Sequence, residues 1–181
     1  MSNRQKRLPV QVDPFRMAEA RRILEGDVPL CQMKRLAAML ENDTGKARVR
    51  LEFGIDEMGA RFLRGTIRAA LSIQCQRCLE PMPWEVDLKL SLGLLHPGED
   101  EARAGVHEPL IFDQVPIHLL DLLEDEILLA LPQIPRHSLE ACPAREYVEP
   151  ATAPDQNDAA TAKTNPFSVL AKMKTATSNE E

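Results

Sequence analysis

Aromatic side chains are scarce in this chain of 181 residues, at 4% of the total. It contains one tryptophan, one tyrosine and five phenylalanines, and none of them obviously alternates with the arginines. RNA modules that read a sequence usually stack bases on such aromatic rings. Base stacking is therefore disfavoured as a function, whereas recognition of a nucleic acid by shape and charge stays open.

Long apolar stretches are also missing. No run of eighteen or more apolar residues occurs, and the basic N-terminal sequence MSNRQKRLPVQVD is not followed by an apolar segment or a small-residue cleavage site. Membrane helices and secretory signals need those features. We therefore expect a soluble, unexported protein in the cytoplasm, with no membrane partner.

Cysteine is limited to four irregularly placed residues: Cys31, Cys75, Cys78 and Cys142. Small secreted proteins carry a denser and more regular disulfide framework. We expect reduced thiols or metal ligands instead.

Charge is divided unevenly along the chain. The formal net charge of -6 argues against a globally basic nucleic-acid binder, but residues 1–50 carry +5 and residues 51–181 carry -11. The basic part could meet phosphate while the acidic part meets a basic protein. Alternatively, the two parts neutralise each other within the fold.

The spacing of apolar residues predicts an α+β fold, in which helices pack against an antiparallel β-meander. Near-helical spacing before residue 47 changes to strict alternation over three successive segments joined by short connections, which is typical of hairpins. The predicted elements are a strand at 8–12, helices at 15–26 and 31–41, three strands between 47 and 92, a strand at 109–112 and a helix at 117–131.

The C-terminal part differs in composition. We expect residues 1–147 to form one folded domain, residues 148–164 to be a disordered linker and residues 175–181 a disordered tail. Between them, NPFSVLAKMK at 165–174 has a capping asparagine and a first-turn proline, which predicts a short docking helix. The residues that share one face of this helix are Phe167, Leu170, Ala171 and Lys174.

The stretch IQCQRCLEP at 73–81 places two thiols three positions apart. A redox pair needs a helix N-terminus to activate the first thiol, but here one strand ends and another begins. His137 and Cys142 could join Cys75 and Cys78 in a closed Cys3His site for one structural zinc ion. Leu79 stands where metal-binding turns often have glycine, so plain buried thiols remain the alternative.

Four arginines share the outward parity of the first two meander strands: Arg48, Arg50, Arg64 and Arg68. Such a row could contact an RNA backbone. The alternative is cross-strand ion pairing with Glu52, Glu85 and Asp87.

No constellation typical of an enzyme is evident. Asp121, Glu124 and Asp125 share a helix face that we expect to be solvated, and His118 has no recognisable nucleophile near it in sequence. A glycine-rich phosphate loop is absent as well. We therefore expect a protein without catalytic activity.

Four segments in order resemble the bacterial YceD family of large ribosomal RNA subunit accumulation proteins. They are LPVQVDPFRMAEARRILEG near the start, CQRC on a hairpin, EDEILLALPQIP followed by a histidine and a cysteine, and the terminal NPFSVLAKMK. The resemblance implies a cytoplasmic protein that supports synthesis, processing or stability of 23S ribosomal RNA and has no known catalytic activity.

Contact with 23S ribosomal RNA or its precursor would then be direct, or would pass through a basic ribosomal protein or an assembly factor bound by the acidic part of the chain. The alternative function is a zinc-stabilised protein–protein interaction adaptor with no direct role on RNA.

Overall fold

The structure is a computed structural model that describes residues 7–147. It divides into two compact units, residues 1–143 and residues 144–181, and from the second only the short helix η3 (Arg145–Tyr147) is described. The predicted linker at 148–164, the docking helix at 165–174 with its face of Phe167, Leu170, Ala171 and Lys174, and the tail at 175–181 lie outside the described residues. These predictions, and the predicted domain boundary at residue 147, stay predictions.

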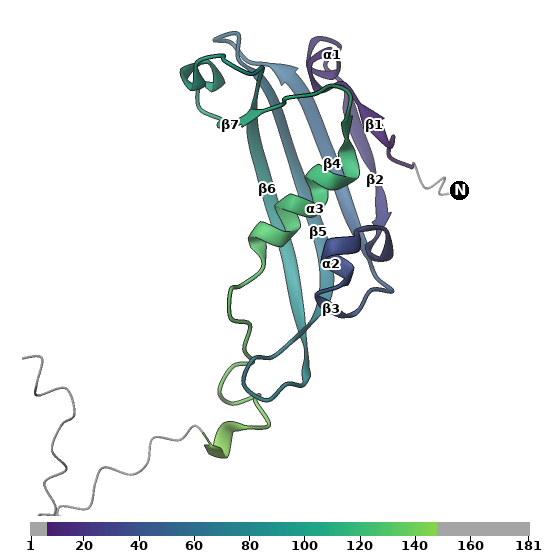
Figure 1. Cartoon of the computed structure of the whole chain (residues 1–181), viewed down its shortest axis with the longest axis vertical. Coiled ribbons are helices and arrows are strands. Elements are labelled where there is room, and N and C mark those ends of the chain that lie inside the picture. The colour runs from purple at the N-terminus through teal and green to yellow at the C-terminus, as the bar shows by residue number, and fades with distance from the viewer. Residues whose placement is uncertain (1–6, 148–181) are drawn as a thin grey trace, which may run out of the picture. The chain divides into compact units, whose positions relative to one another are not determined.

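The centre of the first unit is the expected antiparallel meander (Figure 1). It consists of β4 (Lys46–Ile55), β5 (Arg61–Gln74) and β6 (Pro81–Leu95), which pair in chain order. Alternating apolar residues make one face of these strands buried, so the period of two in the sequence becomes the two faces of the sheet. The α+β class is thereby confirmed.

Three further strands extend this sheet. β2 (Ile23–Pro29) lies antiparallel beside β4, β7 (Glu108–Ile111) runs parallel to β6, and β3 (Leu40–Asn42) pairs with β5. A separate two-stranded sheet joins β1 (Gln11–Val12) to β8 (Ile117–His118). The strands predicted at 8–12 and 109–112 therefore exist, although the first is shorter than expected.

The helix predicted over 15–26 is wrong in its second half. Helix α1 (Pro14–Glu19) begins as expected, with the Asp13 carboxylate accepting hydrogen bonds from the N–H groups of Phe15 and Arg16. The chain then turns at Arg21, whose φ is 48°. Gly26, expected to end the helix, instead pairs with a residue of β4 inside strand β2, because edge pairing to the sheet outweighs local helix propensity.

The helix predicted over 31–41 is also wrong. The segment forms the turn of 3₁₀ helix η1 (Leu30–Gln32), the single α-helical turn α2 (Lys34–Ala37) and strand β3. Leu30, Met33 and Leu36 are all fully buried, and their spacing of three produced the helix-like pattern. Met33 interrupts the helix with φ -88° and ψ 85°.

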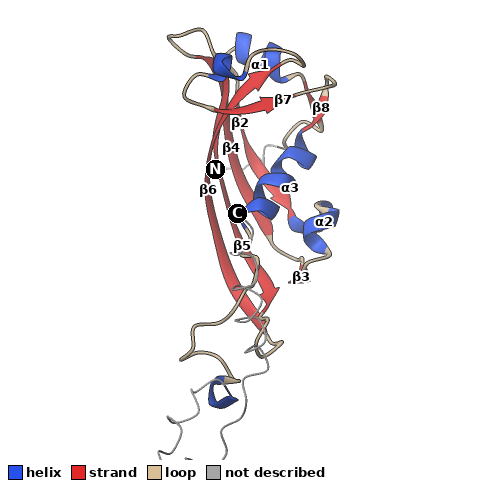
Figure 2. Cartoon of the chain, turned by 60° about the vertical axis from the view of Figure 1, so that its left-hand side comes forward, coloured by secondary structure: helices blue, strands red, loops and turns tan. Residues whose placement is uncertain are grey.

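The predicted helix at 117–131 is confirmed as α3 (Leu119–Ala130), which starts two residues later because the preceding pair forms β8. Leu119, Leu123 and Ile127 are its buried face. Helices α2 and α3 lie on the same side of the sheet (Figure 2). Within residues 7–147 no helix is long and apolar enough to cross a membrane.

The expectation of a solvated acidic face on α3 is wrong for one residue. Glu124 is 4% exposed, and one carboxylate oxygen accepts hydrogen bonds from the backbone N–H groups of Arg35 (2.7 Å) and Leu36 (2.9 Å). The other oxygen accepts one from Arg35 Nε at 3.1 Å. Glu124 therefore caps the start of α2 from a distant helix, a role that its position in the sequence does not reveal.

The opposite face of the sheet is covered at one end only within the described residues. There the short 3₁₀ helix η2 (Glu101–Ala104) packs over Gly93 of β6, and a Cβ atom at Gly93 would lie 2.5 Å from the Cβ of Ala104. The side chain of His107 is fully buried beside it, with Nδ1 2.8 Å from Ser91 Oγ and Nε2 3.5 Å from an Asp56 carboxylate oxygen. The Ser91 contact and the packing of Ala104 against Gly93 hold the η2 segment on the sheet.

Replacing Gly93 with alanine should destabilise the fold by about 2 kcal/mol, because both η2 and the strand must move to admit a methyl group. Chemical denaturation of the purified variant measures this. The matched control is Glu85→Ala at an exposed position of the same strand, which should change stability by less than about 0.5 kcal/mol. Equal stability of the two variants would contradict the packing described.

Candidate functional site

The four residues predicted to bind metal come together in the structure. Their ligand atoms, from Cys75, Cys78, His137 and Cys142, all lie within 4.8 Å of one another. The first two come from the end of β5 and the turn that follows it, and the others come from the loop after α3. Cys31 is exposed and not part of the group.

Local backbone contacts shape the first half of this cluster. Leu79 N–H donates to Cys75 O at 2.9 Å, and Cys75 N–H donates to Glu80 O at 3.0 Å, so the hairpin tip folds into a tight turn. Leu79 has φ 62°, the left-handed conformation that glycine usually supplies, and its side chain is 64% exposed. The turn therefore has the backbone of a metal-binding turn without the glycine.

Two contacts hold the second half of the cluster against the first. Gln76 N–H donates to Pro135 O at 2.8 Å, and His137 N–H donates to Cys75 Sγ at 3.4 Å. His137 Nδ1 lies 3.3 Å from Cys78 Sγ. The loop after α3 is thus placed in part by the bond between Gln76 and Pro135, which joins two main-chain groups and does not involve a metal ligand.

The two thiols of the turn have opposite electrostatic environments. Burial raises the pKa of Cys75, but hydrogen bonds from the backbone N–H groups of Cys78, His137 and Arg77 outweigh it and lower the pKa to about 5. Burial raises the pKa of Cys78, and the neighbouring thiols raise it further. These hydrogen bonds favour the thiolate form of Cys75, which is the form that binds metals.

The donor set fits a four-coordinate zinc ion. Three sulfur atoms and one imidazole nitrogen form the closed Cys3His type of structural site, with no position left for a reacting water molecule. Zn–S bonds of about 2.3 Å place tetrahedral ligand atoms roughly 3.7 Å apart. Ligand atoms within 4.8 Å of one another reach that arrangement by small side-chain movements. The two thiols of Cys75 and Cys78 lie at a strand end and in a turn, as expected, and not at a helix N-terminus.

A second candidate surface is the uncovered face of the sheet. Arg48, Arg50, Arg64 and Arg68 are all exposed there, as their parity predicts. Arg48 lies directly opposite Arg68, Arg50 opposite Thr66, and Arg64 opposite Glu52. The four predicted RNA contacts therefore share one face of two neighbouring strands.

Ion pairing accounts for part of this surface. Arg68 Nε lies 3.1 Å from an oxygen of Asp87, one of the predicted acidic partners. Sequence reasoning missed two others, Glu25 beside Arg50 (3.2 Å) and Asp27 beside Arg48 (3.7 Å). They lie on β2, whose first four residues were expected to end a helix, although the alternation of ILEGDVP was a usable signal. All three arginines remain more than half exposed, so these pairs leave them accessible.

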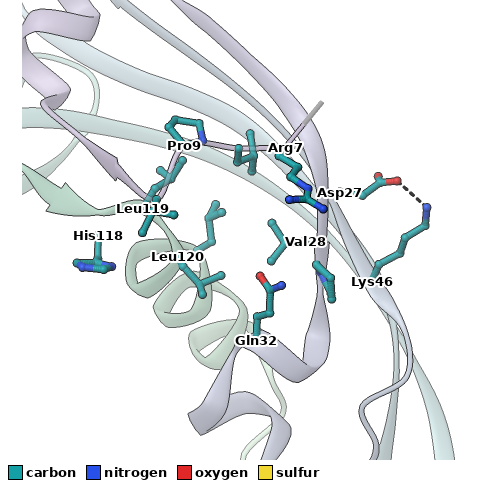
Figure 3. Close-up of a pocket in the computed structure, with 13 residues that line it drawn as sticks. Arg7, Pro9, Asp27, Val28, Gln32, Lys46, His118, Leu119 and Leu120 are labelled. Carbon is teal, nitrogen blue, oxygen red and sulfur yellow. Dashed lines mark hydrogen bonds and ion pairs between the residues drawn. The ribbon is translucent and has the colours of Figure 1, made fainter. Parts of the chain in front are cut away.

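A groove of about 620 Å³ lies on the other side of the sheet, where the N-terminal residues pass the start of α3 (Figure 3). Val28, Leu119 and Leu120 contribute apolar lining, and the Asp27–Lys46 ion pair lies at its edge. It shares no lining residue with the cysteine cluster or with the four arginines.

Comparison with known proteins places the chain in a family. The family model described as large ribosomal RNA subunit accumulation protein YceD matches residues 63–174. A protein of that name from Haemophilus influenzae is 31% identical over 172 residues, which are 93% of this chain and 97% of the relative. No solved structure gives a significant match. The chain therefore belongs to the YceD family, as the four ordered segments predict.

Proposed function

We propose that this protein supports the accumulation of 23S ribosomal RNA in the cytoplasm, without catalysing a reaction. The observation that carries the proposal is the similarity to a protein named for large ribosomal RNA subunit accumulation over nearly the full length of both chains. An RNA role also suits a sheet face whose arginines are exposed.

Direct contact with RNA is the version that the exposed face favours. Arg48, Arg50, Arg64 and Arg68 would attract phosphate and repel a basic ribosomal protein. A basic protein or assembly factor would have to bind elsewhere on the acidic remainder of the chain. We therefore assign RNA contact to the four arginines.

One zinc ion is part of the proposal as a structural element. Cys75, Cys78, His137 and Cys142 would hold it, and the ion would supply four bonds that tie the tip of the β5–β6 hairpin to the loop after α3. Those bonds keep the hairpin tip in place while the arginine face binds RNA.

The proposed function is tested by the ratio of 23S to 16S ribosomal RNA in cells that lack this gene. We expect a selective fall in 23S RNA that a plasmid copy of the wild-type gene restores. An unchanged ratio would contradict the proposed function and would favour an adaptor without a role on RNA.

The arginine assignment has its own test, the simultaneous change of all four arginines to glutamate. We expect crosslinking of the protein to ribosomal RNA in cells to fall at least tenfold, because the change turns attraction of phosphate into repulsion. The control carries the same change of charge at Arg16, Arg21, Arg22 and Lys34, which are also exposed. Undiminished crosslinking of a folded four-arginine variant would contradict direct contact through this face.

A further inference from the structure

Strand register arranges charges on the uncovered face in a definite order. Asp27 on β2 is followed across the sheet by Arg48 on β4, Arg68 on β5 and Asp87 on β6. The two like charges at the centre lie directly opposite each other, and each is paired with the carboxylate on its outer side, Arg48 with Asp27 and Arg68 with Asp87. The carboxylates stand on the two outer strands.

The next row along the strands also has two basic residues but only one acidic residue. It runs from Glu25 through Arg50 and Thr66 to Lys89, so that Thr66 lies between two cations. A shallow hollow of about 300 Å³ is lined here by Arg50, Arg64, Thr66 and Lys89, with Glu52 also contributing. The hollow offers both positive charge and a hydroxyl donor.

Two cations of this hollow are available to a ligand. Within residues 7–147, neither Arg64 nor Lys89 forms an ion pair. The Arg64 guanidinium lies 4.4 Å from the ring centroid of Phe62, which positions the charge without using its hydrogen-bond donors. Sequence reasoning missed Lys89 because it counted only the first two strands of the meander.

The width of the basic strip restricts what can bind. Asp27 and Asp87, which are both ion-paired, stand three strand spacings apart, roughly 14 Å, so the arginines between them occupy a strip only two strands wide. A double helix presents two backbones and is recognised across its minor groove by contacts to both strands. One strand of RNA, in contrast, can keep its phosphates over the four arginines of β4 and β5, with Lys89 of β6 beside them.

We propose that this strip binds single-stranded RNA by its phosphates, and that Lys89, Arg64 and Thr66 form a phosphate site within it. The inference rests on the proposed RNA role and narrows it to the form of RNA. The bases face away from the protein, because no exposed aromatic side chain on this face offers them a stacking surface among residues 7–147. Binding is therefore independent of base sequence.

Fluorescence anisotropy of the full-length protein with labelled 12-nucleotide RNAs tests this. We expect equal affinity for A12, C12 and U12, and weaker binding of a 12-base-pair RNA duplex. Lys89→Gln should lower the slope of log affinity against log salt by about 0.7, the value for one phosphate contact on a single strand. If the variant and wild type bind equally at 1 M salt, this difference in slope makes the variant bind about eightfold more weakly than wild type at 50 mM salt.

Two further variants keep the result interpretable. Lys34→Gln, at a lysine on α2 that is also exposed, should leave the slope and the affinity unchanged. Glu52→Gln should tighten binding, because it removes a carboxylate from the hollow, and a misfolded protein would not show that gain. An unchanged salt slope for Lys89→Gln, or a duplex that binds as tightly as the single strands, would overturn the inference.

The outcomes separate this inference from the proposed function. Lys89-dependent binding of single strands together with an unchanged 23S to 16S ratio would support the site and overturn the proposed function. A selective loss of 23S RNA in the deleted strain together with Lys89-independent binding would do the reverse.

Discussion

Replacing Cys75 with serine should abolish zinc binding and lower the melting temperature by about 8–16 °C. Cys75 is fully buried, and its sulfur accepts the N–H of His137 as well as being one of four potential zinc ligands. A site that is saturated at a thousand times its dissociation constant stabilises the folded state by about 4 kcal/mol. For a domain of this size that stabilisation is equivalent to the stated temperature shift.

Metal analysis and thermal unfolding of protein purified under reducing conditions measure the two effects. Wild type should contain one zinc ion per chain and the Cys75→Ser variant close to none. Cys31→Ser is the matched control, since that thiol is exposed and outside the cluster, and it should keep both zinc and stability. Wild-type protein with far less than one zinc ion per chain would contradict the metal assignment.

Replacing Glu124 with alanine should destabilise the protein by about 3 kcal/mol, equivalent to about 6–12 °C in melting temperature. The carboxylate is buried and accepts the backbone N–H groups of Arg35 and Leu36, of which the second is buried as well. Alanine leaves both donors without an acceptor inside the protein. Of the polar contacts between α2 and α3, only those of Arg35 with Asp125 and with the Asp121 carbonyl remain.

Asp125 supplies the matched control for this change. It lies beside Glu124 and binds the same arginine, with Arg35 Nη1 at 2.6 Å, but both side chains are more than half exposed. Hydrogen bonds to Asp125 and Glu124 raise the pKa of Arg35, so its charge is present at any ordinary pH in either variant. Asp125→Ala should lower the melting temperature by less than about 2 °C. A shift as small for Glu124→Ala would show that the cap on α2 is dispensable.

The meander and the metal ligands could be predicted because their signals are local or chemically rare. A period of two over β4, β5 and β6 specifies which side chains face the core, and therefore which face carries the arginines. Cysteine and histidine are typical zinc ligands, so the pair Cys75 and Cys78 predicted a metal site whose other ligands are His137 and Cys142. The structure brings these four residues together.

What could not be predicted depends on contacts between distant segments. Residues 23–26 continue the apolar spacing of the helix before them, and their pairing with β4 makes them part of strand β2 instead. The burial of Glu124 depends on the two N–H groups that α2 presents to it. The exposed hollow at Lys89 could not be predicted because its lining depends on the register of three strands. The sequence of a single segment does not specify that register.

The bond between Glu124 and Arg35 has a consequence for a chain that is still being synthesised. Its two ends are separated by 89 positions, so the start of α2 leaves the ribosome long before its cap exists. At synthesis rates of about 5–20 residues per second, the delay is roughly 4–18 s. During that time the N–H groups of Arg35 and Leu36 have no Glu124 carboxylate to accept them. A folding step that needs this cap therefore waits until translation has passed the third helix.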